Sequence, residues 1–390
     1  MRLRLIRNVR LVRNTGIRPG SVLVRDGRIT RIDPSEADAV GAEVFDGAGG
    51  LLTPGLIDMH THGIGPHLYE ASPESLVAGA DLLARHGTTC VLPTFYTTLK
   101  RDTLGKLETL AAAVDAVQSC HIVGLHLEGP FLALTGAGAS TLPGDVTLLD
   151  EILAACGGRA RAMSISPETP NILPVIERLC AKGTIPFITH TRATPEQTLA
   201  AIDAGARHAT HFYDVFPAPP ETDPGVRAAG AVEAILADAR VSVDFIADGC
   251  HVHPVAIRAA VAAKGPERVI LITDSSVGAG LPPGTYPTPW GYPVTVREGD
   301  GARIADPAHP QFGGLAGSAI TMADGIRNAL QWLPLPAEQV WAMGTANPAR
   351  LLGLETKGEI REGADADLVL WDEHLRPIRT WLAGECVFEA

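Results

Sequence analysis

The segment His121–Leu132, with the sequence HIVGLHLEGPFL, has the features of a buried β-strand that ends in an acidic residue. Its first half alternates apolar and small residues, and the pair Gly129-Pro130 must end the strand and turn the backbone. Glu128 therefore stands at the carboxyl end of a buried strand. A carboxylate there is costly to desolvate unless a cation or a hydrogen-bond donor meets it. For this segment alone, the alternative is a strand-end glutamate that points into water.

Residues 53–354 contain further strand-like segments of this kind, and they alternate with helix-like segments. Ser72 and Thr194, each followed by proline, match the N-cap and first position of a helix. Eight strand–helix units predict an α/β fold, a (β/α)8 TIM-like barrel. The alternative is a doubly wound open sheet, but no glycine-rich dinucleotide turn follows the first strand. The predicted strands are Leu56–His60, Thr88–Leu92, His121–Glu128, Arg161–Ser166, Ile185–His190, His208–His211, Val241–Asp248 and Val269–Asp274.

The predicted helices lie between and after these strands. A Pro- and Gly-rich stretch from about Leu281 to Gly314 predicts a long loop over the barrel mouth, with a hairpin near Gly301. The predicted helices are Pro73–His86, Thr103–Val117, Pro195–Ala204, Pro254–Lys264, Ser318–Leu333 and Ala337–Leu352.

Both ends of the chain have the pattern of short strands. Neither end has enough residues for a core of its own. Together they predict one small β-sandwich domain, built from residues 1–52 and 355–390 and interrupted by the barrel. The candidate strands and hairpins are Val22–Val24 with Ile29–Ile32, Ala366–Trp371, and Trp381–Leu382 with Cys386–Phe388.

Composition narrows the class of protein and its partners. The chain has 390 residues, 46% of them hydrophobic, so it can bury a large core. Its 32 Lys and Arg against 44 Asp and Glu give a net charge of −12, which argues against nucleic acid and anionic membrane as partners. No apolar run is long enough for a membrane span or a signal peptide. Six widely spaced cysteines predict reduced thiols in a cytoplasmic protein.

Histidines and acids stand at the carboxyl ends of several predicted strands, and a barrel brings these ends together at one face. His60 and His62 are two residues apart, so strand alternation places both imidazoles on one side. One strand-end histidine is most simply a hydrogen-bonded rim residue, but several on one face indicate a divalent metal, with Zn²⁺ the best match and Fe²⁺ or another ion an alternative. His86, His121 and His208 fall off this pattern. The candidates are His60, His62, Glu128, His190, His211, His251 and Asp274, with His253 assigned to the start of a helix.

The chain contains the short motifs TPGLIDMHTHG, GLHLEGPF, HATHF, IADGCHVHP, ITDSSVGAGLPPG, GGLAGS and TANPARLLGL. These motifs resemble the amidohydrolase superfamily, and more narrowly the N-acetylglucosamine-6-phosphate deacetylases. The resemblance implies metal-dependent amide hydrolysis of an N-acyl substrate by a homodimer. It assigns Glu128, His190 and His211 to the main metal, and His60 and His62 to a second ion. It also makes Asp274 the acid/base and places His251 at the substrate carbonyl.

The chain departs from that family where the sugar phosphate would bind. Asp214, followed by Val215, stands where asparagine is usual, Thr222 replaces a phosphate-pairing arginine, and Ser140 replaces a histidine. Arg192, two residues after His190, could supply positive charge to this pocket from another side; the alternative is an exposed loop arginine. A carboxylate about 4 Å from a phosphate opposes each unit charge by roughly 4 kcal/mol at an effective dielectric constant near 20. The sequence therefore predicts deacetylation of an N-acetylated amino sugar without the usual phosphate pocket.

Three alternatives stay open at this level. One is an amidohydrolase that acts on another N-acyl compound, such as an N-acyl amino acid. A second is a different reaction of the superfamily, deamination or cyclic-amide opening. A third is a catalytically idle barrel kept as a binding protein, which the presence of a full set of candidate ligands and of Asp274 disfavours.

Overall fold

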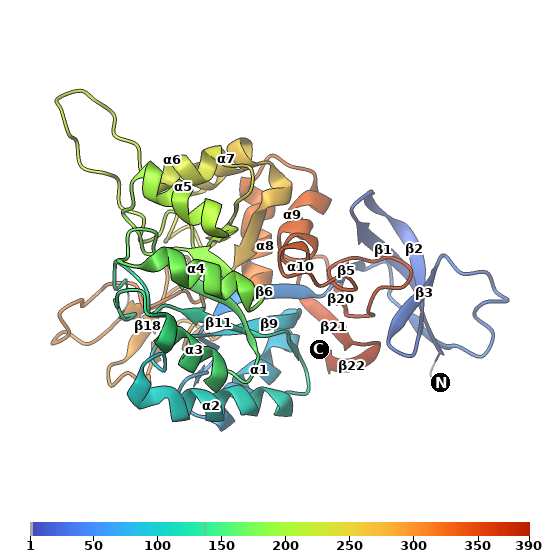
Figure 1. Ribbon diagram of the computed structural model, residues 1–390. Helices are drawn as coiled ribbons and strands as arrows, with labels where there is room; N and C mark the ends of the chain where they lie inside the picture. Colours follow the sequence, from blue (N-terminus) through green and yellow to red (C-terminus); the bar gives the residue numbers. More distant parts are fainter. Residues whose placement is uncertain (1–2, 137) are drawn as a thin grey trace.

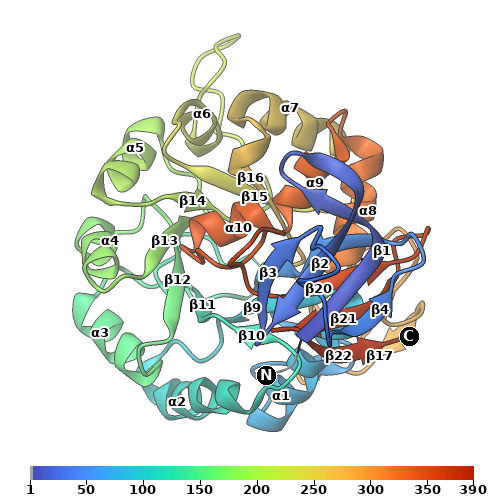
Figure 2. The same cartoon turned by 90° about the vertical axis from the view of Figure 1, so that its right-hand side faces the viewer.

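The computed structural model describes residues 3–136 and 138–390, and their main body is a parallel barrel ringed by helices (Figures 1 and 2). The prediction of a (β/α)8 barrel is confirmed. Eight strands form the ring in the order β6-β9-β11-β12-β13-β14-β15-β16, and Thr61 meets Ser275 in a parallel bridge that closes the ring. These strands are β6 Leu56–Thr61, β9 Thr88–Phe95, β11 Leu125–Glu128, β12 Ala160–Ile165, β13 Ile185–Ile188, β14 His208–Ala209, β15 Ser242–Ile246 and β16 Val269–Ile272.

Helices surround the barrel, and their starts follow the sequence signals. The Ser72 hydroxyl accepts a hydrogen bond from the backbone N–H of Ser75 at 3.1 Å, and Thr194 forms a capping box with Gln197. The helices are α1 Pro73–Leu82, α2 Leu104–Ala113, α3 Val146–Ala155, α4 Ile172–Ala181, α5 Pro195–Ala204, α6 Ala231–Ala237, α7 Pro254–Lys264, α8 Met322–Trp332, α9 Ala337–Met343 and α10 Ala346–Leu351. None of the helices described is long and apolar enough to cross a bilayer.

The predicted strand His121–Glu128 is in fact two strands. β10, His121–Ile122, pairs only with β9, whereas β11 pairs with both β9 and β12. Gly124 lies between them at φ +143°, where a Cβ atom would come within 2.6 Å of the Arg161 side chain. The strand is therefore interrupted at this glycine, and its second part, β11, carries Glu128 at its carboxyl end.

The chain ends form an eight-stranded sheet beside the barrel, on the right of Figure 1, as the sequence predicts. Its core contains Ile6, Leu52, Leu368 and Trp381, all nearly fully buried. The domain limits at residues 52 and 355 stay a prediction. The strands are β1 Leu3–Arg13, β2 Gly16–Arg25, β3 Arg28–Ile32, β4 Glu43–Asp46, β5 Leu51–Pro54, β20 Leu368–Trp371, β21 Pro377–Leu382 and β22 Glu385–Glu389.

Two long segments project from the end of the barrel opposite this sheet (Figure 1). One is the outer loop, residues 217–230, drawn in yellow-green. The other is the mouth segment, residues 281–317, which carries a small antiparallel sheet of β17 Gly284–Tyr286, β18 Val294–Val296 and β19 Arg303–Ile304. The β18–β19 hairpin confirms the turn expected near Gly301.

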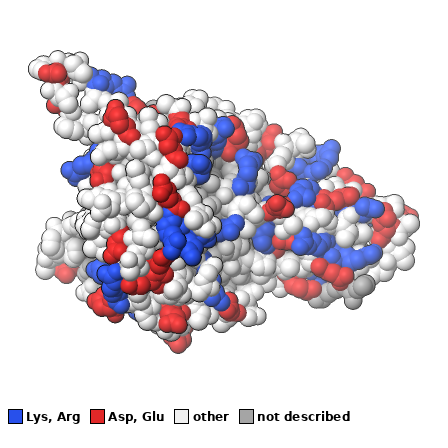
Figure 3. All heavy atoms as spheres, viewed as in Figure 1, with Lys and Arg blue, Asp and Glu red and all other residues white. Residues whose placement is uncertain are grey.

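On the face drawn in Figure 3, lysines and arginines are interspersed with acidic residues, most densely over the sheet from the chain ends. This face carries no extended basic patch of the kind that binds nucleic acid.

Candidate metal centre and cavity

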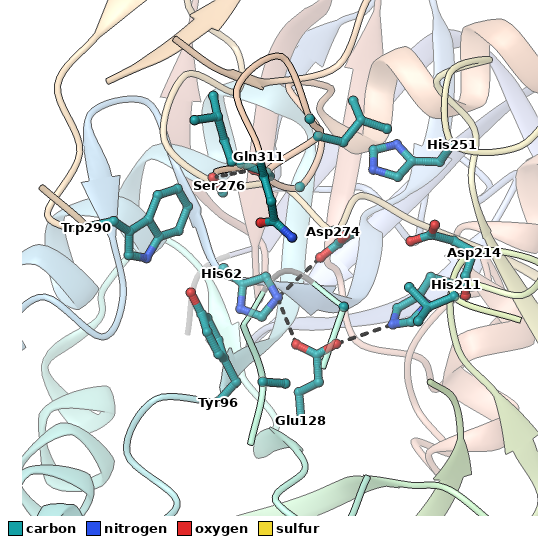
Figure 4. Close-up of a pocket in the computed structure, with 18 of the residues that line it drawn as sticks. His62, Tyr96, Glu128, His211, Asp214, His251, Asp274, Ser276, Trp290 and Gln311 are labelled. Carbon is teal, nitrogen blue, oxygen red and sulfur yellow. Dashed lines mark hydrogen bonds and ion pairs between the residues drawn. The ribbon is translucent and has the colours of Figure 1, made fainter. Parts of the chain in front are cut away.

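Six side chains predicted from the sequence converge at the carboxyl ends of the barrel strands. Figure 4 labels four of them, His62, Glu128, His211 and Asp274. Glu128 Oε1 lies 3.2 Å from His190 Nε2 and 3.3 Å from His211 Nε2. The Nε2 atoms of His60 and His62 are 3.3 Å apart and lie 3.3 and 3.2 Å from Asp274 Oδ1. Among the described residues, two sets of donor atoms lie close enough to hold an ion, His60–His62–Asp274 and His60–Glu128–His211.

Backbone geometry after the strands aims three of these side chains. His190, His211 and Asp274 follow β13, β14 and β16 with φ values of +49°, +36° and +46°. This left-handed region is unfavourable for residues other than glycine and is found where the surrounding structure holds the chain in place. The strained backbone is therefore a feature of the cluster itself.

Hydrogen bonds orient the four imidazoles in the same way. His62 Nδ1 lies 3.2 Å from the Thr94 carbonyl oxygen, and His190 Nδ1 lies 2.8 Å from the Leu134 carbonyl oxygen. His211 Nδ1 lies 3.3 Å from the Asp214 carbonyl oxygen. Because a carbonyl only accepts, each Nδ1 carries a proton, and Nε2 is the ring nitrogen that faces the centre of the cluster. This is the arrangement that metal-binding histidines require.

The Nδ1 atom of His60 is also held by a hydrogen bond, but to a hydroxyl group instead of a carbonyl oxygen. Its Nδ1 lies 3.2 Å from Thr210 Oγ1, and that hydroxyl donates to Asp244 at 3.0 Å. The hydroxyl oxygen is therefore left to accept the His60 Nδ1 proton. Asp244 is fully buried and also accepts from His208 Nε2 at 2.7 Å.

Charge in the cluster is strongly coupled. Burial alone would lower the pKa of His62, but hydrogen bonds to Asp274 and Glu128 raise it to about 10. His211 is likewise raised to a pKa of about 10, against burial, by its hydrogen bond to Glu128. Burial would raise the pKa of Glu128, yet the nearby imidazoles hold it well below its usual range. Protons thus lie between imidazoles and carboxylates, and a divalent cation at the centre would replace them.

A second acid–imidazole pair lies beside the cluster. Asp248 Oδ2 accepts from His251 Nδ1 at 2.7 Å, and Asp248 Oδ1 accepts from the backbone N–H of His251 at 3.0 Å. Both side chains are almost fully buried. Burial would lower the pKa of His251, but the hydrogen bond and the charge of Asp248 raise it above its ordinary value. The pair fixes the ring and leaves Nε2 free for a ligand.

Sequence reasoning overlooked a buried polar layer beneath the cluster. His126 is fully buried, with Nδ1 3.0 Å from the Met59 carbonyl oxygen and Nε2 2.9 Å from Ser164 Oγ. Its ring lies 4.6 Å from that of His60. His208 and Asp244 belong to the same layer. Strand alternation offered a signal, because His126 is two residues before Glu128 and Asp244 is four before Asp248.

A cavity of about 400 Å³ opens above the cluster, within the range of about 300–1,000 Å³ typical of small-molecule sites. Asp214 and Val215 line it, together with His251 and Asp274. Its remaining lining residues include Tyr96, Gly136, Ala139, Ser276, Trp290, Tyr292, Ile304, Gln311, Phe312 and Leu315.

Three other sequence candidates lie outside this cavity. Ser140 is half-buried and adjacent to Gly129, although its neighbour Ala139 lines the cavity. Thr222 is exposed on the outer loop. Arg192 lines a second cavity of about 460 Å³ beneath that loop, and its backbone N–H donates to Glu168 at 2.7 Å. Their roles in substrate binding stay a prediction.

Comparisons with known proteins agree with this architecture. The model of the Amidohydrolase family matches residues 51–387. The N-acetylglucosamine-6-phosphate deacetylase of Lysinibacillus sphaericus is 34% identical over 388 residues, which cover 97% of this chain and 96% of that protein. The N-acetylgalactosamine-6-phosphate deacetylase of Escherichia coli O157:H7 is 31% identical, over 93% of both chains.

Solved structures give the same result. A mutant of the N-acetyl-D-glucosamine-6-phosphate deacetylase from Mycobacterium smegmatis, in complex with N-acetyl-D-glucosamine-6-phosphate, superposes with a TM-score of 0.86. It is 31% identical in sequence, and the match covers 99% of this chain and 100% of that one.

Proposed function

Because this chain belongs to the amidohydrolase family, we propose that its metal-dependent amide hydrolysis is the deacetylation of an N-acetylated amino sugar. The observation that carries this proposal is the convergence of four imidazole Nε2 atoms and two carboxylates at the floor of one cavity. The relatives at 31–34% identity over nearly the whole chain are named as deacetylases of such sugars.

The donor set fits a divalent metal. Nitrogen and carboxylate oxygen ligands suit Zn²⁺, and Fe²⁺ or another divalent ion is the alternative. Glu128, His190 and His211 would hold the main ion, and His60 and His62 would hold a second one. Such an ion, when bound, acts as a Lewis acid toward the amide carbonyl and lowers the pKa of water.

Asp274 is placed to move the proton of the reaction. Burial would raise its pKa, but hydrogen bonds from His60 and His62 keep it well below the ordinary value, so the carboxylate is ionised and ready to accept. It would take a proton from the attacking water and return it to the amine. The amine needs that proton, because it leaves poorly without one.

His251 is placed to bind the substrate carbonyl. Its Nδ1 proton is held by Asp248, so the opposite edge of the ring faces the cavity. The raised pKa of His251 favours an imidazolium that donates to the oxygen on which negative charge develops. Asp248 acts through His251 and is a positioning residue.

Acetate release from N-acetylated amino sugars tests this function. The Zn²⁺-loaded protein should release acetate, lose at least a hundredfold in kcat/KM on chelation, and recover when metal is restored. His190→Ala should behave like the chelated protein, whereas His374→Ala, a control at an exposed position far from the cluster, should not. Acetate release that survives chelation and His190→Ala would contradict the proposal.

The other family reactions remain the second candidate. Asp274 and the His60–His62 pair would serve deamination or cyclic-amide opening as well, and an N-acyl amino acid offers the same amide. Ammonia release or ring opening without acetate release, in a panel of such compounds, would favour them.

We also propose that the protein is a cytoplasmic homodimer. Its six cysteines are all unpaired in the structure, as a reducing compartment requires. The dimer rests on the family resemblance alone, and light scattering of the purified protein tests it.

A further inference from the structure

The wall of the cavity differs in kind from its floor, and the mouth segment supplies most of it. Trp290 and Tyr292 are half-buried, and their rings stack with centroids 5.8 Å apart and an interplanar angle of 27°. Phe312 lies at the rim with 59% of its surface exposed. Large apolar side chains left open to solvent around a concave site indicate a surface that a ligand covers. Figure 4 shows Trp290 and Tyr96 across the cavity from Asp214 and His251.

The lining charges are acidic apart from the imidazoles. Glu128, Asp214 and Asp274 contribute carboxylates, and no lysine or arginine is among the described residues that line the cavity. Arg303, on the mouth segment, is engaged with other groups, because it donates to Asp300 at 2.7 Å and to the Gly313 carbonyl oxygen at 2.9 Å.

Two arginines of the neighbouring loops do not line this cavity. Arg227, on the outer loop, is paired with Glu233 at 3.0 Å. Arg192 belongs to the second cavity and not to this one. A phosphate that moved from water into this cavity would therefore face carboxylates with no lysine or arginine among the described lining residues to pair with it.

We propose that the cavity takes an N-acetylated amino sugar without a phosphate group, with the sugar ring lying on the aromatic wall and Asp214 opposite it. This assignment rests on the proposed deacetylase function and names its substrate class. Asp214 and Trp290 are its specificity-determining residues.

The chemistry of an uncharged sugar matches both sides of the cavity. The C–H face of a pyranose ring is apolar and can cover an aromatic surface. The half-buried rings of Trp290 and Tyr292 offer such a surface. Sugar hydroxyls donate hydrogen bonds, and the carboxylate of Asp214 is an acceptor that needs no cation to bind them. A phosphate dianion, of about −1.5 to −2 charges near pH 7, would meet the same carboxylate with repulsion.

The proposed substrate differs from those of the relatives, because the names of the L. sphaericus and E. coli proteins specify 6-phosphates. If the proposal holds, this chain shares their fold and reaction but not their charged substrate group.

Kinetics on three substrates test the proposal. Acetate release is measured for N-acetylglucosamine, its 6-phosphate and an aryl β-glycoside of N-acetylglucosamine, using the metal-loaded, full-length protein in its native oligomeric state. We expect kcat/KM for the unphosphorylated sugars to exceed that for the 6-phosphate by at least tenfold. Equal values or a preference for the phosphate overturn the proposal, including the case in which a second copy supplies a cation. No acetate from any of the three contradicts the deacetylase function itself.

Two variants locate the discrimination. Asp214→Asn should raise the ratio of kcat/KM for the 6-phosphate to that for the free sugar by at least tenfold. Glu298→Gln, a control that neutralises an exposed acid on the same mouth segment outside the cavity, should leave the ratio unchanged. An unchanged ratio in Asp214→Asn overturns the role of Asp214.

The aromatic wall has its own variant pair. Trp290→Ala should raise KM for the unphosphorylated sugars at least fivefold with a smaller change in kcat, and Trp290→Phe should recover most of the loss. A fall in kcat as large as the rise in KM, in both variants, would indicate a general disturbance of the mouth segment and overturn the stacking role.

Discussion

The floor and the wall of the cavity are built by different means. Floor residues such as Glu128, His190 and His211 come from the ends of separate barrel strands, are buried, and are held by hydrogen bonds from several elements. Wall residues such as Trp290 and Phe312 come from one long segment without barrel pairing and remain partly in solvent. The difference teaches that one cavity can combine a floor fixed by several barrel strands with a wall supplied mostly by a single segment outside the barrel.

Asp274→Asn should give the largest effect and tests the floor directly. Loss of the carboxylate removes the group that carries the proton, so kcat should fall by about 10²–10⁴-fold. Metal content, measured by elemental analysis, should stay near the wild-type value. Asp102→Asn, at an exposed position just before α2, is the control. Near-native turnover with metal in place would remove Asp274 from the acid/base role.

Asp248→Asn should give a smaller loss, because it affects the floor through His251. The asparagine should keep part of the orientation of the His251 ring, so kcat should fall by about 10–100-fold. The pH profile distinguishes this role from a structural one. Asp248 raises the pKa of His251, and the protonated ring is the donor, so the alkaline limb of kcat should move to lower pH in the variant. An unshifted limb would show that His251 does not act as the protonated donor.

Glu70→Gln tests the connection between floor and wall. The buried Glu70 carboxylate accepts from the backbone N–H groups of Tyr96, Thr97 and Thr98, and so holds the loop that carries Tyr96 into the cavity. Replacing a charged acceptor with an amide leaves donors poorly matched, and we expect unfolding free energy to fall by about 1–3 kcal/mol. Urea unfolding at fixed metal concentration measures this, with exposed Glu108→Gln as the control. No loss of stability would show that the loop is held by other contacts.

Phe312→Ala should have the smallest effect, because its ring is mostly in solvent. We expect KM to rise by at most about threefold with kcat unchanged, since the ring lies at the rim and a small sugar would cover only part of its apolar area. A fall in kcat comparable to that of a floor variant would break the distinction between floor and wall.

The sequence was informative where one local signal met a strong topological rule. Glu128, His190 and Asp274 each follow a short, mostly apolar run, His211 ends the short predicted strand His208–His211, and a parallel barrel brings all such ends to one face. Their convergence could therefore be predicted without any knowledge of distances. The pairing of His60 with His62 followed from strand alternation alone.

The sequence was less informative where strands are short or segments irregular. The strand β14 has only two residues, too few for a periodic signal to mark His208 and its neighbours as an interior layer. Gly124 gave no sign that it splits a strand. The aromatic wall depends on how the mouth segment folds back over the barrel, and a Pro- and Gly-rich stretch carries no period that fixes such a path. For the same reason Thr222 and Arg192 could not be placed in advance.

Anomalous diffraction from a crystal of the Zn²⁺-loaded protein tests the central claim most directly. The account predicts an ion at the floor of the cavity, bonded to Glu128, His190 and His211 at about 2.0–2.2 Å. An ion found only elsewhere, or these three side chains directed away from a common centre in the loaded protein, would contradict it.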